Sequence, residues 1–138
     1  MTTFFSDSAR SLGVQLATDG AAWGAPSDRN KKENIIELDH EETLSLVDQL
    51  PIYQFNFKGI DPDVINRGPM AQDWHELFPS KKDPLRIETL DLDGVTLSAL
   101  KGLLKKVTEL EEQMTELHDL KGLVMEVCDR LSALESAE

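Results

Sequence analysis

The sequence has a single cysteine, Cys128, which excludes an intrachain disulfide and a cysteine-rich zinc site. It lacks a run of about 18 apolar residues, so we predict no membrane-spanning segment. The first ten residues lack a basic start followed by an apolar stretch, so we expect no secretory signal. The three histidines, His40, His75 and His118, do not have the spacing of a helical metal motif. We therefore expect no metal, no cofactor and no membrane partner.

Positive charge is also scarce, with 14 Lys and Arg residues against 26 Asp and Glu residues, for a net charge of −12. Proteins that bind the nucleic-acid backbone gather an excess of positive charge, so we expect no nucleic-acid partner. Hydrophobic residues make up 40% of the 138 residues, which is enough for a core and argues against disorder throughout. This length suits one compact domain with an appendage.

We predict an α+β protein made of three parts: residues 1–26, 27–94 and 95–138. In the first part, Leu12, Val14 and Leu16 alternate with less apolar residues, which indicates a short strand. Glycine, alanine and proline in residues 18–26 then indicate turn and loop.

Residues 27–94 are predicted to form a small mixed domain. Asp39 and Glu42 have the spacing of a helix capping box, and Pro51 ends the helix that follows, because proline cannot continue its hydrogen bonds. A second short helix is predicted over residues 71–78, before Pro79. Short strands are expected at residues 35–38, 52–57, 64–65 and 85–90, with a turn at 91–94. The aromatic residues are expected in the core rather than in a ligand site: Tyr53, Phe55, Phe57, Trp74 and Phe78.

Residues 95–138 have a heptad pattern that predicts a long helix of the coiled-coil type. The apolar residues follow steps of three and four: Leu100, Leu103, Val107, Leu110, Met114 and Leu117. The next step, to Leu120, is again three residues, which is a stammer that locally overwinds a coiled coil. Gly122 follows the stammer, so the pattern is compatible with a straight helix or with a bend there. Such a helix cannot bury its own apolar stripe and needs partner helices, from this chain or from copies of it.

Ser27 and Lys32 are the first candidates for chemistry. A serine hydroxyl becomes a nucleophile when a base removes its proton, and lysine serves as that base when burial lowers its pKa. A spacing of five places the two side chains on no common face of a helix or strand, so they meet only if the chain turns between them. Asp28 and Asn30 are turn residues. Spacing alone favours a polar surface turn with solvated lysines.

Other polar groups are weaker candidates on pattern alone. Gln72, just after a Gly-Pro pair, is placed to orient a neighbour or to donate to an oxyanion, but plain helix entry is the simpler interpretation. Glu88, Asp91 and Asp93 lack the ligand count of a calcium loop and are interpreted as a solvated turn. Cys128 is interpreted as a small packed residue of the helical seam.

Four motifs, in this order and spacing, resemble the peptidase S74 family, the intramolecular chaperone domain at the C-terminus of phage tail spikes and tail fibres. Residues 27–35 resemble the opening motif of that family, in which aspartate follows serine and lysine lies five positions after the serine. The aromatic strand resembles residues 50–58, and the glycine–alanine–glutamine segment resembles residues 67–73. The exit into a trimerising coil resembles residues 91–95. The resemblance runs from about Trp23 to about Glu112, and the C-terminal helix continues it in kind.

The resemblance implies a chaperone that assembles a homotrimeric fibre and then cuts itself off. It implies cleavage between Pro26 and Ser27, with Ser27 as nucleophile, Lys32 as general base, and positioning groups among Asp28, Asn34 and Gln72. The expected partners are two further copies of the chain, as a trimer or a dimer of trimers, and the fibre shaft. Assembly is expected in the host cytoplasm, with the fibre portion remaining in the virion tail.

Two alternatives belong to other classes. The first is a trimerisation module of a viral fibre that keeps its N-terminal segment attached, and the second is a coiled-coil adaptor for an unrelated partner. Because 26 residues are too few for a fibre shaft, we expect the chain to be either an excised fragment or a short, separately encoded protein.

Overall fold

The computed structural model describes residues 2–5, 13–16, 18 and 20–137. The chain divides into two compact units, Met1–Leu38 and Asp39–Glu138. Within the residues that are described, none of the helices is both long and apolar enough to span a membrane.

The first unit contains a three-stranded antiparallel sheet. Its strands, in spatial order, are β1 (Thr2–Phe5), β2 (Gly13–Leu16) and β3 (Trp23–Gly24). Phe4 pairs with Val14, and Leu16 pairs with Trp23. Strand β2 confirms the strand predicted around Val14 and Leu16, while Leu12 lies outside the described residues.

Two predictions for the first unit are wrong. Residues 18–26 were expected to be turn and loop throughout, but β3 pairs with β2, and the Trp23 ring lies 5.6 Å from that of Phe4. A two-residue strand is too short to show a periodic pattern. Residues 35–38 form no strand, and Ile36 is 84% exposed, because this stretch pairs with no neighbouring strand.

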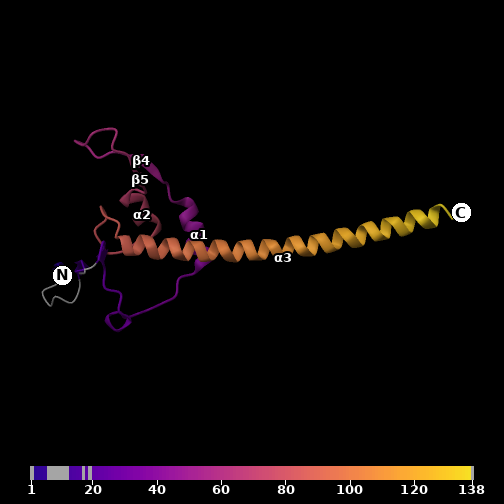
Figure 1. Cartoon of the computed structure of the whole chain (residues 1–138), viewed down its shortest axis with the longest axis horizontal. Coiled ribbons are helices and arrows are strands. Elements are labelled where there is room, and N and C mark those ends of the chain that lie inside the picture. Colours follow the sequence, from indigo (N-terminus) through magenta and orange to yellow (C-terminus); the bar gives the residue numbers. More distant parts are fainter. Residues whose placement is uncertain (1, 6–12, 17, 19, 138) are drawn as a thin grey trace. The chain divides into compact units, whose positions relative to one another are not determined.

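The second unit combines one small sheet with three helices (Figure 1). Its elements are α1 (His40–Gln49), β4 (Tyr53–Phe55), β5 (Asn66–Gly68), α2 (Ala71–Leu77) and α3 (Thr89–Glu135). Strands β4 and β5 pair antiparallel, with Gln54 opposite Arg67. The predicted α+β class, with short elements before a long C-terminal helix, is confirmed.

Three predictions for residues 64–94 differ from the structure. The strand predicted at residues 64–65 is found at Asn66–Gly68, as β5, because the chain is still in a turn at Val64, whose N–H donates to Asp61 O. The strand at residues 85–90 and the turn at 91–94 are wrong, since α3 already begins at Thr89. Asp91 lies in the first turn of α3, where a carboxylate is favoured by the helix dipole.

Asp39 caps helix α1, as the sequence predicts. Its Oδ1 accepts hydrogen bonds from the backbone N–H groups of Glu41, at 2.9 Å, and Glu42, at 3.0 Å. Both bonds hold the pKa of Asp39 below its ordinary value of 3.8, and the bond from Glu42 has the larger effect. The helix ends at Gln49, before Pro51, as predicted.

Replacing Asp39 with alanine is expected to lower the melting temperature at neutral pH, and Asp39→Asn, which keeps an accepting oxygen but lacks the charge, is expected to lower it less. Because the folded pKa of Asp39 is lowered, its charge adds stability that is fully present above the unfolded value of 3.8 and is lost as the pH falls through the folded value. The advantage of the wild type over Asp39→Asn should therefore shrink on acidification. Thermal unfolding followed by circular dichroism at several pH values measures it, and a pH-independent difference would contradict the prediction.

Helix α1 packs on α3 through small buried residues. Ser98, Ala99 and Gly102 of α3 are all buried. His40 Nδ1 lies 2.8 Å from Ser98 Oγ, and a Cβ on Gly102 would lie 2.2 Å from the carbonyl oxygen of His40. The absence of a side chain at Gly102 therefore allows this close approach. Lys105 also forms an ion pair with Glu41, which raises the pKa of Lys105.

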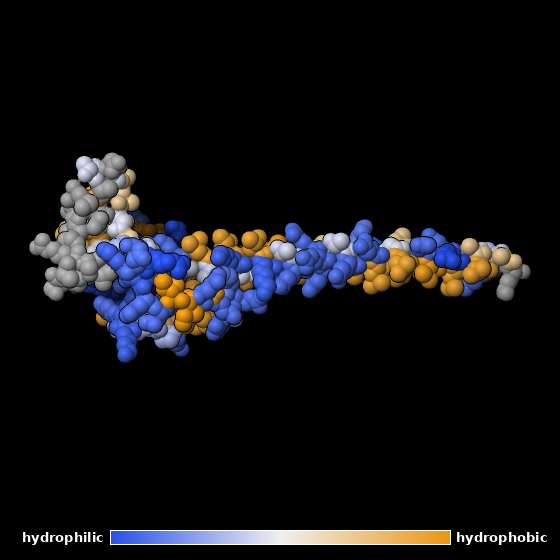
Figure 2. Space-filling model, turned by 90° about the horizontal axis from the view of Figure 1, so that it is seen from below, coloured by the Kyte–Doolittle hydropathy of each residue, from blue (hydrophilic) through white to orange (hydrophobic). Residues whose placement is uncertain are grey.

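Helix α3 continues unbroken through Gly122, so the chain neither breaks nor folds back there. At 1.5 Å per residue it is about 70 Å long, and it extends far beyond the other elements of the unit (Figure 1). Its apolar stripe is exposed along this length, from Leu110 at 58% to Leu134 at 69% (Figure 2). Cys128 is exposed as well, so the packing predicted for it is not found within the chain.

The apolar core within the described chain is small and consists of Leu50, Trp74 and Ala99. The Trp74 ring lies 4.7 Å from that of Phe78, the residue that follows α2. The prediction of an aromatic core is confirmed for Trp74 but wrong for Tyr53 and Phe57, which are 42% and 61% exposed. These two lie on or next to a two-stranded sheet that is too small to cover them.

Candidate functional site

The first unit brings Ser27 and Lys32 together. Lys32 Nζ donates a hydrogen bond of 2.7 Å to Ser27 Oγ. The 3-10 helix η1 (Arg29–Lys31) lies between them and reverses the chain, which makes the contact possible despite the spacing of five. A hydroxyl and an amine at this distance have the geometry required for proton transfer between them.

Asp28 holds this turn closed. Its Oδ1 accepts from the backbone N–H of Asn30 and from Asn30 Nδ2, both at 3.0 Å. Lys31 N–H and Lys32 N–H then donate to the carbonyl oxygens of Asp28 and Arg29, both at 3.1 Å. Asp28 therefore acts on the backbone that returns Lys32 to Ser27, rather than on the Ser27 hydroxyl.

Both members of the Ser27–Lys32 pair are exposed in the single chain. A protonated lysine donates to the hydroxyl, whereas a neutral one accepts its proton along the same line. Exclusion of water favours the neutral amine. The exposed pair therefore has the arrangement of a nucleophile and its base, but the single chain does not supply the dry surroundings that activate a lysine base.

The other predicted site residues belong to other segments of the chain. Asn34 follows the turn with a φ of 53°, in the left-handed region that asparagine tolerates better than most residues. Its position accounts for a change of chain direction before the extended residues 35–38. Gln72 is exposed in the first turn of α2, in the second unit. Pro26 directly precedes Ser27 in an irregular stretch.

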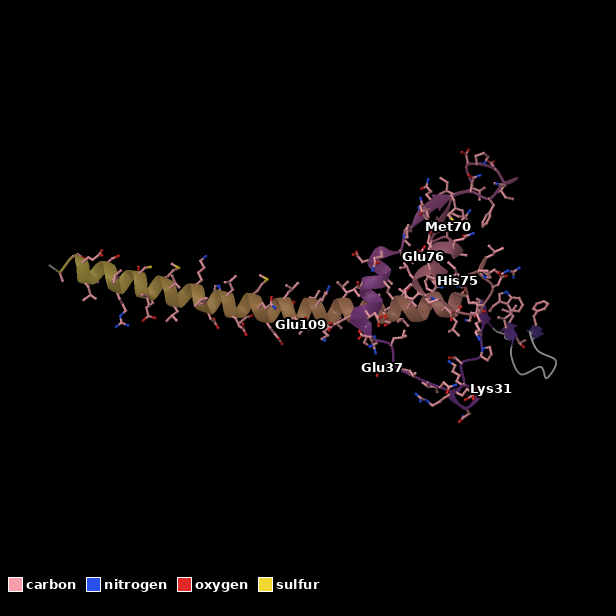
Figure 3. The ribbon with its side chains drawn as sticks, turned by 180° about the vertical axis from the view of Figure 1, so that it is seen from behind. Lys31, Glu37, Met70, His75, Glu76 and Glu109 are labelled. Atoms are coloured by element: carbon pink, nitrogen blue, oxygen red, sulfur yellow. The ribbon has the colours of Figure 1, made fainter. Side chains whose placement is uncertain are left out.

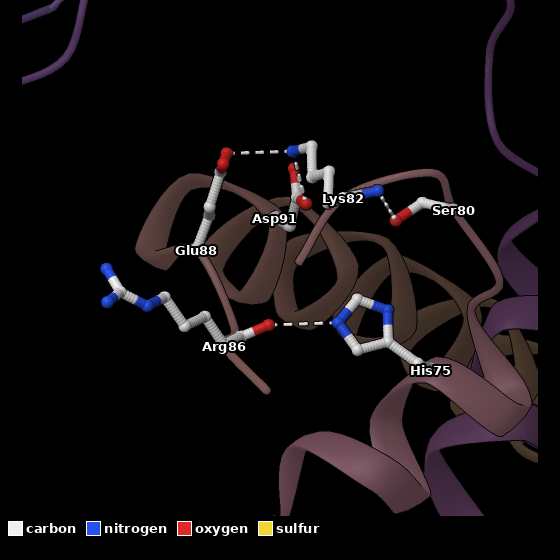
Figure 4. A network of polar contacts seen from close by, with 6 residues as sticks. All are labelled: His75, Ser80, Lys82, Arg86, Glu88 and Asp91. Atoms are coloured by element: carbon white, nitrogen blue, oxygen red, sulfur yellow. Dashed lines mark hydrogen bonds and ion pairs between the residues drawn. The ribbon is translucent and has the colours of Figure 1, made fainter. Parts of the chain in front are cut away.

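A second polar cluster, formed by Lys82, Glu88 and Asp91, joins the loop before α3 to the start of that helix (Figure 4). The sequence did not lead us to expect it. Lys82 Nζ donates to Asp91 Oδ2 at 2.6 Å and to Glu88 Oε2 at 2.8 Å. These partners, Asp91 first, raise the pKa of Lys82 above its ordinary value of 10.5. The two carboxylates therefore belong to an ion-pair cluster at the start of α3, not to the solvated turn that we predicted.

His75 makes a separate contact with the same loop. From α2, its Nε2–H donates to the backbone carbonyl of Arg86 at 2.9 Å (Figure 4). Its Nδ1 is buried and makes no hydrogen bond within the described structure. Figure 3 shows His75 and the exposed Glu76 side by side on α2, with Met70 at the start of that helix. Among the residues described, no His, Cys, Asp and Glu side chains are grouped in a way that could hold a metal ion.

The serine–lysine turn and the long helix together define a class of protein. A serine–lysine pair on a tight turn precedes a small α+β unit, and this unit ends in a long helix with an uncovered apolar stripe. Such a helix is typical of a module that associates with other chains.

Comparison with protein families identifies the kind of module. Residues 27–82 match the family model Peptidase_S74, the chaperone of endosialidase. The match begins at Ser27 and ends at Lys82, and it therefore includes both the serine–lysine turn and the first residue of the ion-pair cluster. It confirms the resemblance and supports a chaperone role. No curated protein matches the chain.

Proposed function

We propose that this chain is an intramolecular chaperone that assembles a homotrimeric phage tail fibre or tail spike and then releases itself by cutting the Pro26–Ser27 bond. The observation that carries the proposal is the 2.7 Å contact between Lys32 Nζ and Ser27 Oγ, at the start of the segment that matches the family. Assembly would take place in the host cytoplasm, and the fibre portion would stay in the virion tail.

The proposed reaction is single and intramolecular. Ser27 Oγ gives its proton to neutral Lys32 and bonds to the carbonyl carbon of Pro26. The C–N bond between Pro26 and Ser27 then breaks, and the lysine returns the proton to the leaving amine of Ser27. Water hydrolyses the resulting ester, which frees the Pro26 carboxylate and restores the serine. The hydrogen bonds of Asp28 support this step by keeping the turn closed.

Exposure of the site in one chain gives a physical reason to couple cleavage to assembly. A lysine base needs exclusion of water, and both side chains are exposed in the single chain. Neighbouring chains in a trimer would supply that exclusion. The long helix with its uncovered stripe supplies the means of association, because linking three chains at one end raises their effective concentration. Cleavage would then report correct assembly.

The test compares the wild type with Ser27→Ala. We expect the purified wild type to lose the mass of residues 1–26 and to begin at Ser27, whereas Ser27→Ala keeps its full mass in the same oligomeric state. Intact-mass spectrometry combined with light scattering measures both properties. If both proteins stay uncut as trimers, the chain is instead a non-cleaving trimerisation module. A defined complex with an unrelated protein, without a homotrimer, would favour the adaptor.

A further inference from the structure

The exposed stripe of α3 contains two possible seams that diverge at Leu117. Up to Leu117 the apolar residues follow one heptad frame, in which Leu100 is at position a and Leu103 at position d. In Figure 2 the apolar side chains run along one edge of α3 in its first part and along the opposite edge toward its C-terminus. A strict heptad stripe already drifts around a straight helix by about 20° per heptad, and the three-residue step to Leu120 adds to this drift.

The two seams beyond Leu117 differ in chemistry. An unbroken heptad would place these three residues at core positions a: Lys121, Cys128 and Glu135. A seam that shifts by the three-residue step to Leu120 would replace them with Leu120, Val127 and Leu134, which are 56%, 54% and 69% exposed. Val124 and Leu131 belong to both seams. Burying copies of Lys121 and Glu135 against one another is costly, whereas the shifted seam is apolar throughout.

We propose that the chains associate through α3 as a parallel, in-register coiled coil whose seam shifts at Leu117–Leu120. The occupant of the apolar face is thus a further copy of this chain, and this inference rests on the trimer in the proposed function. Helix α1 does not obstruct the arrangement. Its contacts on α3 at Ser98, Gly102 and Lys105 fall at positions f, c and f, and buried Ala99 falls at g, while the core positions Leu100 and Leu103 remain 59% and 49% exposed.

Charge complementarity selects this orientation and this seam. In a parallel coil, a residue at position g lies beside position e of the neighbouring chain, five residues further along. In the first frame this pairs Lys106 with Glu111. In the shifted frame it gives two more charge pairs, Glu116 with Lys121 and Arg130 with Glu135, and it places apolar Leu123 beside Cys128. Lys121, Cys128 and Glu135 thus become matched flanking residues instead of core residues.

Contacts within one helix do not account for these pairs. Residues five apart lie on different sides of a helix, whereas residues three or four apart interact. Lys121 has no acidic residue at those spacings, because its neighbours there are Leu117, His118, Val124 and Met125. Arg130 pairs with Glu126 of its own helix at 4.0 Å, whereas the parallel arrangement offers Lys121 a partner in Glu116 of a neighbouring chain.

Disulfide trapping tests the seam. Cys128 is the single native cysteine, so the wild type reports position 128, and Val127→Cys combined with Cys128→Ser reports position 127. Identical core positions approach closely in a parallel coil, whereas flanking e positions lie too far apart for a disulfide. Under mild oxidation we expect an interchain disulfide from position 127 and none from position 128. Faster cross-linking at position 128, or none at either, overturns the proposal.

A charge-reversal cycle tests the orientation on the same oligomer. Lys121→Glu is expected to lower the melting temperature, and Glu116→Lys combined with Lys121→Glu is expected to recover most of that loss. The control combines Lys121→Glu with Glu112→Lys, which has the same net charge but lies at the outer position f and should show no coupling. Equal recovery in both pairs, or in neither, overturns the proposal. Cleavage at Ser27 is measured separately by mass, so failure of the seam and failure of the proposed function are distinguishable.

Discussion

Lys32→Met is expected to slow release of the N-terminal piece by about 10²–10⁴-fold, which is the usual contribution of a positioned general base. The physical reason is that Lys32 Nζ, 2.7 Å from Ser27 Oγ, is the group placed to take its proton. An ammonium cannot accept a proton, so the wild-type rate should rise with pH, while that of the variant should not follow it. Mass spectrometry of timed samples after trimer formation measures both rates.

Two neighbouring substitutions act as controls. Lys31→Met removes the same charge from the same turn and should leave cleavage near the wild-type rate. Lys32→Arg keeps the charge but stays protonated, so it should be nearly as slow as Lys32→Met. Wild-type cleavage by Lys32→Arg would show that another group is the base. Light scattering on each variant separates a loss of chemistry from a loss of assembly.

Gly102→Ala is expected to destabilise the second unit by about 1–3 kcal/mol, although alanine favours a helix more than glycine does. The new Cβ would lie 2.2 Å from the His40 carbonyl oxygen and 2.9 Å from its carbon. These are backbone atoms, so relief requires α1 to move away from α3. The contact between His40 and Ser98 should then be lost as well. Chemical denaturation followed by circular dichroism measures the change.

Gly122 provides the matched control on the same helix. A Cβ there meets no atom within 4 Å. Gly122→Ala should therefore stabilise α3 by about 0.5–1 kcal/mol, through helix propensity alone. If both substitutions stabilise the protein to the same degree, the close approach of α1 at Gly102 is wrong.

Local features of this fold were predictable from the sequence. Asp39 and Pro51 mark the two ends of α1 because capping and the missing proline N–H act within one turn of helix. The long helix was predictable from its heptads, although its start was placed too late. The acidic run that contains Asp91 and Asp93 suggested a turn but in fact belongs to the first part of α3.

Features that depend on distant residues were not predictable in the same way. Nothing in the two-residue strand β3 indicates its pairing with β2. The spacing of Ser98, Ala99 and Gly102 was the one available signal of a close helix contact, since small residues recur there on one side of α3. The polar contacts of Lys82 and His75 join residues from different elements, which a periodic pattern does not show.

The proximity of Ser27 and Lys32 is an intermediate case. Turn residues between them made a contact possible, but the spacing of five was equally compatible with two solvated side chains. The structure shows the contact and the Asp28 bonds that close the turn. The catalytic roles of these residues come from the family resemblance and remain a proposal.

The small core has a consequence for how the protein behaves at low abundance. With Leu50, Trp74 and Ala99 as its buried apolar residues, a solitary chain has little to hold its second unit together. If the chains associate as proposed, folding would be governed by mass action, because association would cover the stripe of α3. Early in synthesis, when copies are few, chains would stay largely unstructured. Once their number passes a threshold, they would fold and associate in one step, so dosage itself would set the onset of assembly.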